Sequence, residues 1–213
     1  MKLYNSCVRS RLLYNAGVSA YTRIQLDKID AAHRRNLRRL LGIYYPERIS
    51  NQEIYQQTES KLISVSITEL RWTMLGHTLR LPEETPGNKA IKQYYRRKVE
   101  QTDIPRKSTR RGRVLTTIPR LLQLDIQKLG RRIRNDNFAI SELKTGGDLA
   151  LLKRKAGNRD NWKKSVTLLV EKEQQLWNDR DNKKKAQRDK VRAAKLRLQT
   201  QGQRTMHDYY ART

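Results

Sequence analysis

The sequence predicts an all-α protein, and three observations carry that prediction. Gly and Pro number only 10 and 5 in 213 residues, and aromatic side chains make up 7%, a composition that disfavours short strands joined by tight turns. Apolar side chains recur at i, i+3 and i+4 along several segments. Gly, Pro and helix-capping residues separate these segments. We therefore expect a helical bundle, then a basic linker, then a long charged C-terminal helix.

Residues 1–98 are predicted to form the helical bundle. A helix is expected over 24–42, with Gly42 at its C-terminal cap. The segment 63–81 is apolar around most of the helix circumference, and we expect it at the centre of the fold. Further helical segments are expected over 2–20, after a capping box at Ser50–Glu53, and over 88–98.

The remainder of the chain is predicted to hold three parts. Residues 99–117 are expected to be a basic linker, because the chain from Arg96 to Arg113 holds eight Lys or Arg against two acids, with Pro and Gly as breakers. Residues 118–177 are expected to form a helical connector, in which Asp148 caps one helix. Residues 178–213 are expected to be a charged helix or a disordered tail.

The charge of the chain indicates its kind of partner. It has 47 Lys and Arg against 21 Asp and Glu, a formal net charge of +26, and a polyanion neutralises such an excess most readily. Nucleic acid, as RNA or DNA, is the leading candidate. The apolar runs of the chain fall far short of the ~18 residues that span a bilayer, and the sequence shows no signal-peptide pattern. We expect an intracellular protein, nuclear or cytoplasmic, with no membrane partner.

Motifs of catalysis and metal binding are missing from the sequence. No Gly-rich phosphate loop occurs, the three His have no metal-ligand spacing, and a single Cys anchors no zinc site. The acids form no cluster of the kind that phosphoryl transfer requires. We expect no enzyme, no catalytic residue, no cofactor or metal, and no small-molecule substrate.

Five conspicuous side chains are expected to serve structure. His33 lies in an apolar stripe and His77 on the central helix. For both, we favour burial with one hydrogen bond to a backbone carbonyl over a catalytic role. Trp72 and Trp162 belong to apolar stripes and are expected to be core anchors. Cys7 is interpreted as a small buried apolar residue.

Basic residues are the candidate binding residues. Four arginines without interleaved acids follow one face of the helix predicted over 24–42, and arginine's planar fork suits phosphate. The basic segment after Arg96 is expected to follow a nucleic-acid backbone or to serve as a nuclear import signal. The predicted nucleic-acid-binding residues are Arg34, Arg35, Arg38, Arg39, Arg71, Arg80, Arg96, Arg97, Lys107, Arg110, Arg111 and Arg113.

Several stretches resemble, in order, the polyproteins of non-LTR (LINE-type) retrotransposons. The stretches are residues 37–43 (LRRLLGI) with 49–54 (ISNQEI), 70–80 (LRWTMLGHTLR) with 84–90 (ETPGNKA), 110–119 (RRGRVLTTIP) and 149–162 (LALLKRKAGNRDNW). Together they fall within about residues 8 to 170. In that family they lie downstream of the reverse-transcriptase palm, in the thumb and the C-terminal connector.

The resemblance implies a thumb-like bundle and a connector that bind template RNA or DNA. Whether another chain supplies the upstream domains as partners stays open at the level of sequence. The family's polymerase acids sit in a Tyr-x-Asp-Asp turn, and this sequence contains no such turn. The chain is therefore expected to lack both the polymerase palm and the endonuclease.

Two other interpretations stay open at the level of sequence. The C-terminal helix is a candidate for pairing with another helix in an interaction or scaffold protein, although its apolar stripe fades after Trp177. The chain is also interpretable as a degenerate retroelement relic without a selected function.

Overall fold

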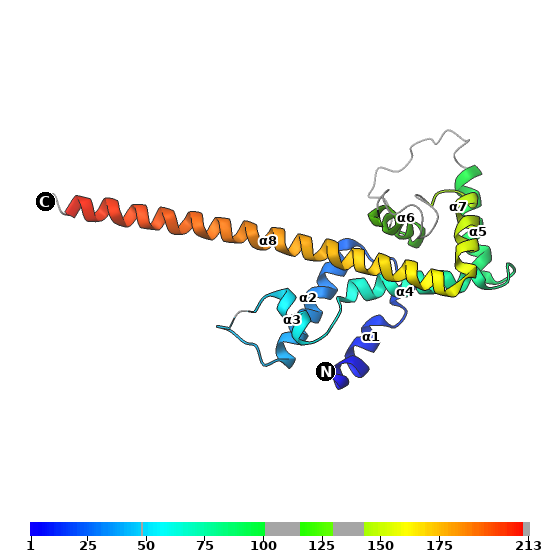
Figure 1. Cartoon of the computed structure of the whole chain (residues 1–213), viewed down its shortest axis with the longest axis horizontal. Coiled ribbons are helices and arrows are strands. Elements are labelled where there is room, and N and C mark those ends of the chain that lie inside the picture. The colour runs from blue at the N-terminus through cyan, green and yellow to red at the C-terminus, as the bar shows by residue number, and fades with distance from the viewer. Residues whose placement is uncertain (48, 101–115, 130–142, 211–213) are drawn as a thin grey trace. The chain divides into compact units, whose positions relative to one another are not determined.

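A computed structural model describes residues 1–47, 49–100, 116–129 and 143–210 of the chain. The regular elements of these described residues are helices, with no strand among them, so the all-α prediction is confirmed (Figure 1). The chain divides into two compact units, Met1–Gln174 and Gln175–Thr213, which we call unit 1 and unit 2. In order, the elements are η1 (Tyr4–Arg9), α1 (Ser10–Leu13), η2 (Ala16–Val18), α2 (Arg23–Leu40), α3 (Asn51–Gln57), α4 (Ile63–Arg80), α5 (Pro86–Glu100), α6 (Ile118–Leu129), α7 (Gly146–Gly157) and α8 (Arg159–Tyr210).

Helix α2 has well-defined signals at both ends. Thr22 and Gln25 form a reciprocal capping box at its start. At its end Gly42 adopts a left-handed φ of 71°, where a Cβ would be strained, and this confirms the predicted glycine cap. The Gly42 N–H donates to the Arg39 carbonyl at 3.2 Å and the Ile43 N–H donates to the Arg38 carbonyl at 3.0 Å, which is a Schellman motif. The chain therefore reverses direction directly after α2.

Two shorter helices start at side-chain caps. Ser50 caps α3 by accepting the Glu53 N–H at 3.2 Å, as the sequence predicts. At α7 the prediction is wrong by one turn, because Thr145 is the cap and Asp148 is its partner three residues later. Asp148 accepts the Thr145 N–H at 2.8 Å, so its carboxylate completes a capping box rather than starting the helix.

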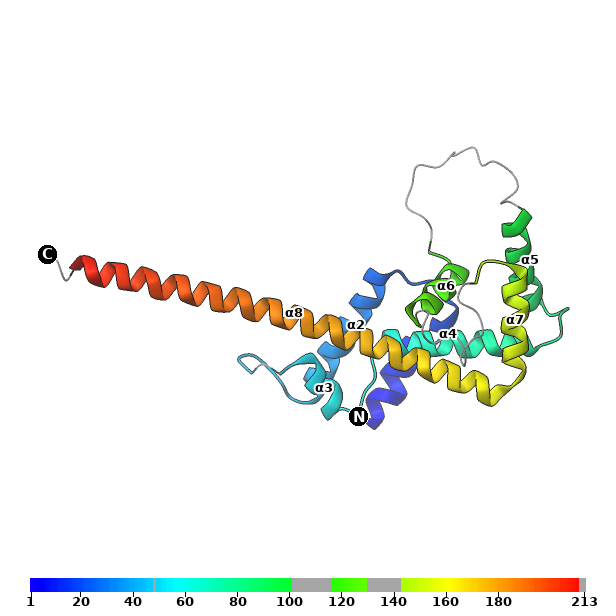
Figure 2. The same cartoon turned by 45° about the horizontal axis from the view of Figure 1, so that its top comes forward.

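Helix α4 forms the centre of unit 1, as its apolar composition predicts. It packs beside α2 and α7 (Figure 2) and against η2, and eleven of its residues are buried. Its N-cap is Leu62, whose side chain offers no capping group. The buried Asp30 of α2 substitutes for it by accepting the Ser64 N–H at 3.0 Å.

Unit 1 joins two segments that the sequence analysis separates. Helix α7 packs against both α4 and α5, so residues 1–98 and the connector up to Gln174 share one core. Most of the predicted basic linker lies outside the described residues, and its character stays a prediction.

The described part of unit 2 is the continuation of α8. Every described side chain from residue 182 to residue 199 is exposed to solvent. This part of the chain holds eight Lys or Arg and a single acid, Asp189. Its large apolar side chains are few and exposed, so this part of the helix has no broad apolar face with which to build a core of its own.

Candidate nucleic-acid interface

The exposed cations of α2 lie on one face. Arg35 and Arg39 are exposed and stand one helical turn apart. Lys28, two turns before Arg35, is exposed as well and extends the row, although the sequence analysis did not single it out. We call Lys28, Arg35 and Arg39 the α2 row. The residues between them, Ala31 and Ala32, are small and exposed, so a phosphate backbone meets little steric hindrance along this face.

The other two arginines that were predicted to bind from this helix, Arg34 and Arg38, are half-buried and have protein partners. The Arg38 Nη2 donates to the Asn51 Oδ1 at 2.8 Å, which ties the end of α2 to the start of α3. Burial is the main cause that lowers the pKa of Arg38, and the neighbouring Arg34 charge lowers it further. Burial raises the pKa of Tyr55 to about 12, while the charge of Arg34 and a hydrogen bond with it act in the opposite direction. Arg34 and Arg38 thus hold α2 against α3.

Arg71 is placed in the core rather than at an interface. Its side chain is only 3% exposed, and its Nη1 pairs with the Asp125 Oδ2 at 2.9 Å. The Trp72 Nε1 donates to the same oxygen at 3.1 Å. A buried arginine that neutralises a buried carboxylate does not reach a phosphate in this conformation, so the predicted role of Arg71 as a binding residue is replaced by a structural one.

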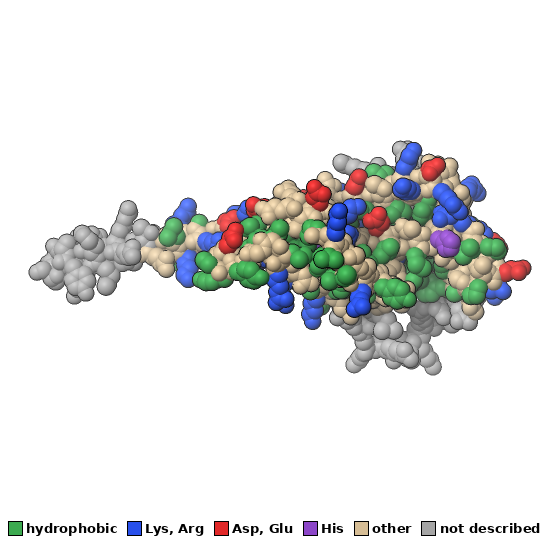
Figure 3. Space-filling view, turned by 90° about the horizontal axis from the view of Figure 1, so that it is seen from below, with side chains coloured by type: hydrophobic (Ala, Val, Ile, Leu, Met, Phe, Trp, Pro, Cys, Tyr) green, Lys and Arg blue, Asp and Glu red, His purple; other side chains and the backbone are tan. Residues whose placement is uncertain are grey.

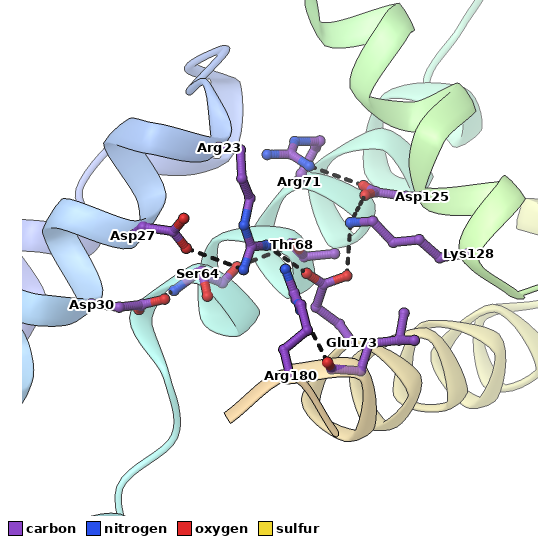
Figure 4. A network of polar contacts seen from close by, with 11 residues as sticks. Arg23, Asp27, Asp30, Ser64, Thr68, Arg71, Asp125, Lys128, Glu173 and Arg180 are labelled. Carbon is purple, nitrogen blue, oxygen red and sulfur yellow. Dashed lines mark hydrogen bonds and ion pairs between the residues drawn. The ribbon is translucent and has the colours of Figure 1, made fainter. Parts of the chain in front are cut away.

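A network of charged side chains extends from this pair across unit 1 (Figure 4). Lys128 of α6 contacts the Asp125 Oδ1 at 3.0 Å and the Glu173 Oε2 at 2.7 Å. The Glu173 Oε1 pairs with Arg23 Nη1 at 3.4 Å, at the start of α2. Because Glu173 and Asp125 are almost fully buried, the cations around them are engaged in holding α2, α4, α6 and α8 together.

The remaining predicted binding residues differ in their surroundings. Arg80 is half-buried, and its Nη1 donates to the Ala156 carbonyl of α7 at 3.1 Å. Arg96 is exposed on α5, and Arg97 belongs to the same helix, but its side chain is not described. Four predicted residues lie outside the described part of the chain: Lys107, Arg110, Arg111 and Arg113.

Unit 2 carries a second exposed row of cations. At about 100° per residue, five basic side chains fall within an arc of about 100° on α8 and extend along it for about 16 Å. They are Lys184, Lys185, Arg188, Arg192 and Lys195, all exposed, and we call them the α8 stripe. Three further exposed cations, Lys183, Lys190 and Arg197, lie on the opposite side of the same helix.

Two exposed tyrosines follow the α2 row and were missed by the sequence analysis. Tyr44 is 64% exposed and Tyr45 is 86% exposed, in the loop after the Gly42 reversal (Figure 1). The signal was present in the sequence as a Tyr-Tyr-Pro run just beyond a predicted helix cap. Aromatic side chains beside arginines are a common composition of surfaces that bind unpaired bases.

The core anchors and the histidines show which predictions about buried residues hold. Trp72 and Trp162 are buried with their ring centroids 5.9 Å apart, which confirms both as core anchors. His33 is buried too, and its Nδ1 lies 2.7 Å from the Tyr4 hydroxyl. His77 and Cys7 are exposed, so the predicted burial of these two residues is wrong.

His33 is strongly perturbed by its surroundings. Its pKa is lowered from 6.5 to about 4, mainly by burial and to a lesser extent by the nearby Arg9 charge. The ring is therefore neutral near pH 7. It is stacked on Tyr4 with 5.6 Å between ring centroids and lies against Tyr55. A neutral ring enclosed by aromatic side chains stabilises the contact of α2 with the N-terminal segment.

The described residues offer no group of three His, Cys, Asp or Glu that would hold a metal ion. None of the helices searched in this part of the chain is long and apolar enough to cross a bilayer. On the face that Figure 3 presents, Lys and Arg side chains are spread among hydrophobic ones instead of forming a single patch. The candidate interface therefore comprises two separate surfaces, the α2 row with its tyrosines and the α8 stripe.

Comparison of the chain with protein-family models, with curated proteins and with solved structures finds no match.

Proposed function

We propose that this chain is a non-catalytic nucleic-acid-binding protein of the nucleus or cytoplasm. It corresponds to the thumb and connector of a non-LTR retrotransposon reverse transcriptase, without palm or endonuclease, and binds template RNA or DNA. One observation carries the proposal: an excess of +26 charges, of which two rows, on α2 and α8, are exposed to solvent.

The positions of the acids support this proposal. The acids of unit 1 that are buried, Asp30, Asp125 and Glu173, already have partners within the fold. The segment 182–199, which carries the α8 stripe, contains one acid and eight basic residues. Internal pairing therefore leaves a large cationic surplus, and release of condensed counterions makes its binding to a polyanion favourable.

The packing of the retrotransposon-like stretches is consistent with a fragment that folds by itself. Arg71 and Trp72 of the stretch 70–80 share Asp125 as their partner. Gly76 of the same stretch lies against the indole of Trp162, the last residue of the stretch 149–162. These stretches thus contact one another or α6 in unit 1, which gives a physical reason for their residue types.

The test is fluorescence anisotropy of the full chain with a labelled RNA hairpin, a single strand and a DNA duplex, each across a salt series. We expect log K to fall with log[salt] at about −0.9 per phosphate contact on the duplex. Tighter binding of structured RNA than of the duplex at equal salt supports the template-binding role. Absence of binding at about 50 mM salt would contradict the proposal.

Two controls separate this function from its alternatives. Replacing Arg35 and Arg39 by Gln is expected to reduce the salt slope by about 2, because each replacement removes one phosphate contact. Primer extension with Mg²⁺ and a primed template is expected to give no product, since the polymerase acids are not in the sequence.

Helix pairing is a second candidate function, favoured by one observation. Val191 and Leu198, seven residues apart on α8, are 62% and 69% exposed and share one side of the helix. Sedimentation of the full chain decides between the two functions. A dimer that persists at high salt favours pairing, whereas a monomer that binds nucleic acid supports the proposal above.

A further inference from the structure

The loop that follows α2 is held in place at its base. The Ile43 N–H donates to the Arg38 carbonyl at 3.0 Å, and the side chain of Ile43 is buried. Across the base of the loop, Arg38 also donates to Asn51 at 2.8 Å. Within the loop, the Glu47 N–H donates to the Tyr44 carbonyl at 2.9 Å and closes a turn. Ile43 is thus tied to the end of α2, and residues 44–47 form a turn directly after it.

The turn formed by residues 44–47 exposes two aromatic rings in succession. Tyr44 and Tyr45 are 64% and 86% exposed, whereas Tyr4, Tyr55 and Tyr95 are buried in unit 1. An aromatic ring gains stability from burial, so two adjacent exposed rings on an anchored loop form a surface suited to a partner. Leu40 and Leu41, which precede these tyrosines in the chain, are also 51% and 37% exposed.

The charge beside the rings indicates the chemistry of that partner. Arg39 lies five residues before Tyr44, and the Gly42 N–H donates to the Arg39 carbonyl at 3.2 Å where the chain turns between them. Arg35 continues the cations one turn further along α2. Flat apolar rings beside exposed guanidinium groups suit a ligand that alternates flat bases with phosphates. In a duplex the faces of the bases are already stacked on each other, whereas an unpaired strand presents them.

We propose that Tyr44 and Tyr45, together with Arg35 and Arg39, form a platform on which unpaired nucleotides of a single strand stack. The proposal rests on the nucleic-acid-binding function above and names the form of nucleic acid that this surface recognises. Arg39 and Arg35 hold successive phosphates while the rings accept the bases. Glu47 is exposed in the same loop, and its negative charge repels the phosphates of the strand.

The experiment measures binding of the full chain to two labelled probes at one salt concentration. One probe is a single strand that carries 2-aminopurine, whose fluorescence reports base stacking, in an RNA and a DNA version. The other is a duplex of equal length. The variant is Tyr44→Leu/Tyr45→Leu, which keeps apolar side chains but removes both rings. Tyr14→Leu is the matched control, because Tyr14 is 79% exposed on another part of unit 1.

We expect the double variant to lose the change in 2-aminopurine fluorescence that reports stacking on binding. We also expect it to bind the single strand at least tenfold more weakly. Duplex affinity should change less than twofold, and Tyr44→Phe/Tyr45→Phe should restore the single-strand affinity. Glu47→Gln should strengthen binding of both probes. The unfolding midpoint should not change in any of these variants, since all the substituted side chains are exposed.

Three results would overturn the proposal of a stacking platform. The first is an unchanged single-strand affinity in the double variant, as expected if the tyrosines bind a protein instead. The second is an equal loss for the duplex and the single strand. The third is a strand of abasic nucleotides that binds the wild type as tightly as the base-bearing strand. Failure of the broader function is distinguishable, because the wild type would then bind neither probe.

Discussion

Units 1 and 2 use the same basic residue types in different ways. In unit 1, Arg71 is 3% exposed and paired with Asp125, and the half-buried Arg80 donates to a backbone carbonyl. In unit 2, the five cations of the α8 stripe are exposed on a helix that buries none of its side chains between residues 182 and 199. A count of positive charges therefore overstates the binding surface. What matters is which cations the core already uses.

The largest effect is expected from breaking the network in unit 1. Asp125→Ala leaves Arg71 buried without its carboxylate and removes partners of Trp72 and Lys128. We expect a loss of about 3–5 kcal/mol in the free energy of unfolding. The matched control is Asp27→Ala, whose ion pair with Arg23 is solvent-exposed, with an expected loss of about 0–1 kcal/mol. Urea titration measures both, and similar losses would contradict the structural role of Arg71.

The second effect is a pH dependence that arises from His33. Its pKa of about 4 in the folded state lies below its ordinary value of 6.5, so the unfolded chain takes up this proton more readily. The fold therefore keeps its full stability above pH 6.5 and loses up to ~3 kcal/mol as the pH falls to 4. Comparison of the wild type with His33→Phe isolates this contribution, since the other titrating groups are common to both. An identical pH profile would show that His33 does not contribute.

A smaller effect is expected at the contact between the two tryptophan-bearing helices. A Cβ on Gly76 would lie 2.2 Å from the Trp162 Nε1, which donates a hydrogen bond to the Trp72 carbonyl at 3.1 Å. Gly76→Ala is expected to cost about 1–3 kcal/mol and to shift the tryptophan emission, because the ring must move. Gly157→Ala is the control, since its Cβ would meet nothing within 4 Å. Equal unfolding midpoints for the two variants would be inconsistent with this packing.

The smallest effect is expected from an ion pair at the surface of unit 1. Glu83 contacts both Lys92 and Lys153, and hydrogen bonds from Lys153 and Lys92 lower the pKa of its carboxyl from 4.5 to about 2. The stabilisation is present above pH 4.5 and disappears as the pH falls to 2. Because the group is exposed, salt screens it, and Glu83→Gln should shift the unfolding midpoint less than Gly76→Ala does. A shift larger than that of Gly76→Ala, measured at low and high salt, would contradict this order.

Local signals in the sequence were sufficient for most helices of the fold. The α2 helix, its glycine cap and the apolar α4 follow from periodicity and from Gly42, which act over a few residues. The predicted cap at Asp148 was wrong because Thr145, which also caps well, stands three residues earlier. Local competition of this kind shifts a helix start by a turn without altering the fold.

The candidate site was less predictable, because it depends on contacts between distant segments. Arg71 and Asp125 are 54 residues apart, and nothing local in the sequence marks them as partners. The exposure of His77 depends on which side of α4 its neighbours leave uncovered, and a stripe pattern on one helix does not contain that information. The exposed Arg35 and Arg39 were predicted as binding residues, and their binding stays a prediction.

We expect nucleic acid to bind to cations that the fold leaves exposed, and those on α8 to bind according to their arrangement along the helix. Two variants with equal charge test it: Arg188→Gln/Arg192→Gln/Lys195→Gln in the stripe, and Lys183→Gln/Lys190→Gln/Arg197→Gln on the opposite side. The measurement is the slope of log K against log[salt] for a labelled RNA. We expect the stripe variant to lose about 3 from the slope and the opposite variant clearly less. Equal losses would show that the chain acts only as a polycation, and an unchanged slope in both would contradict this expectation.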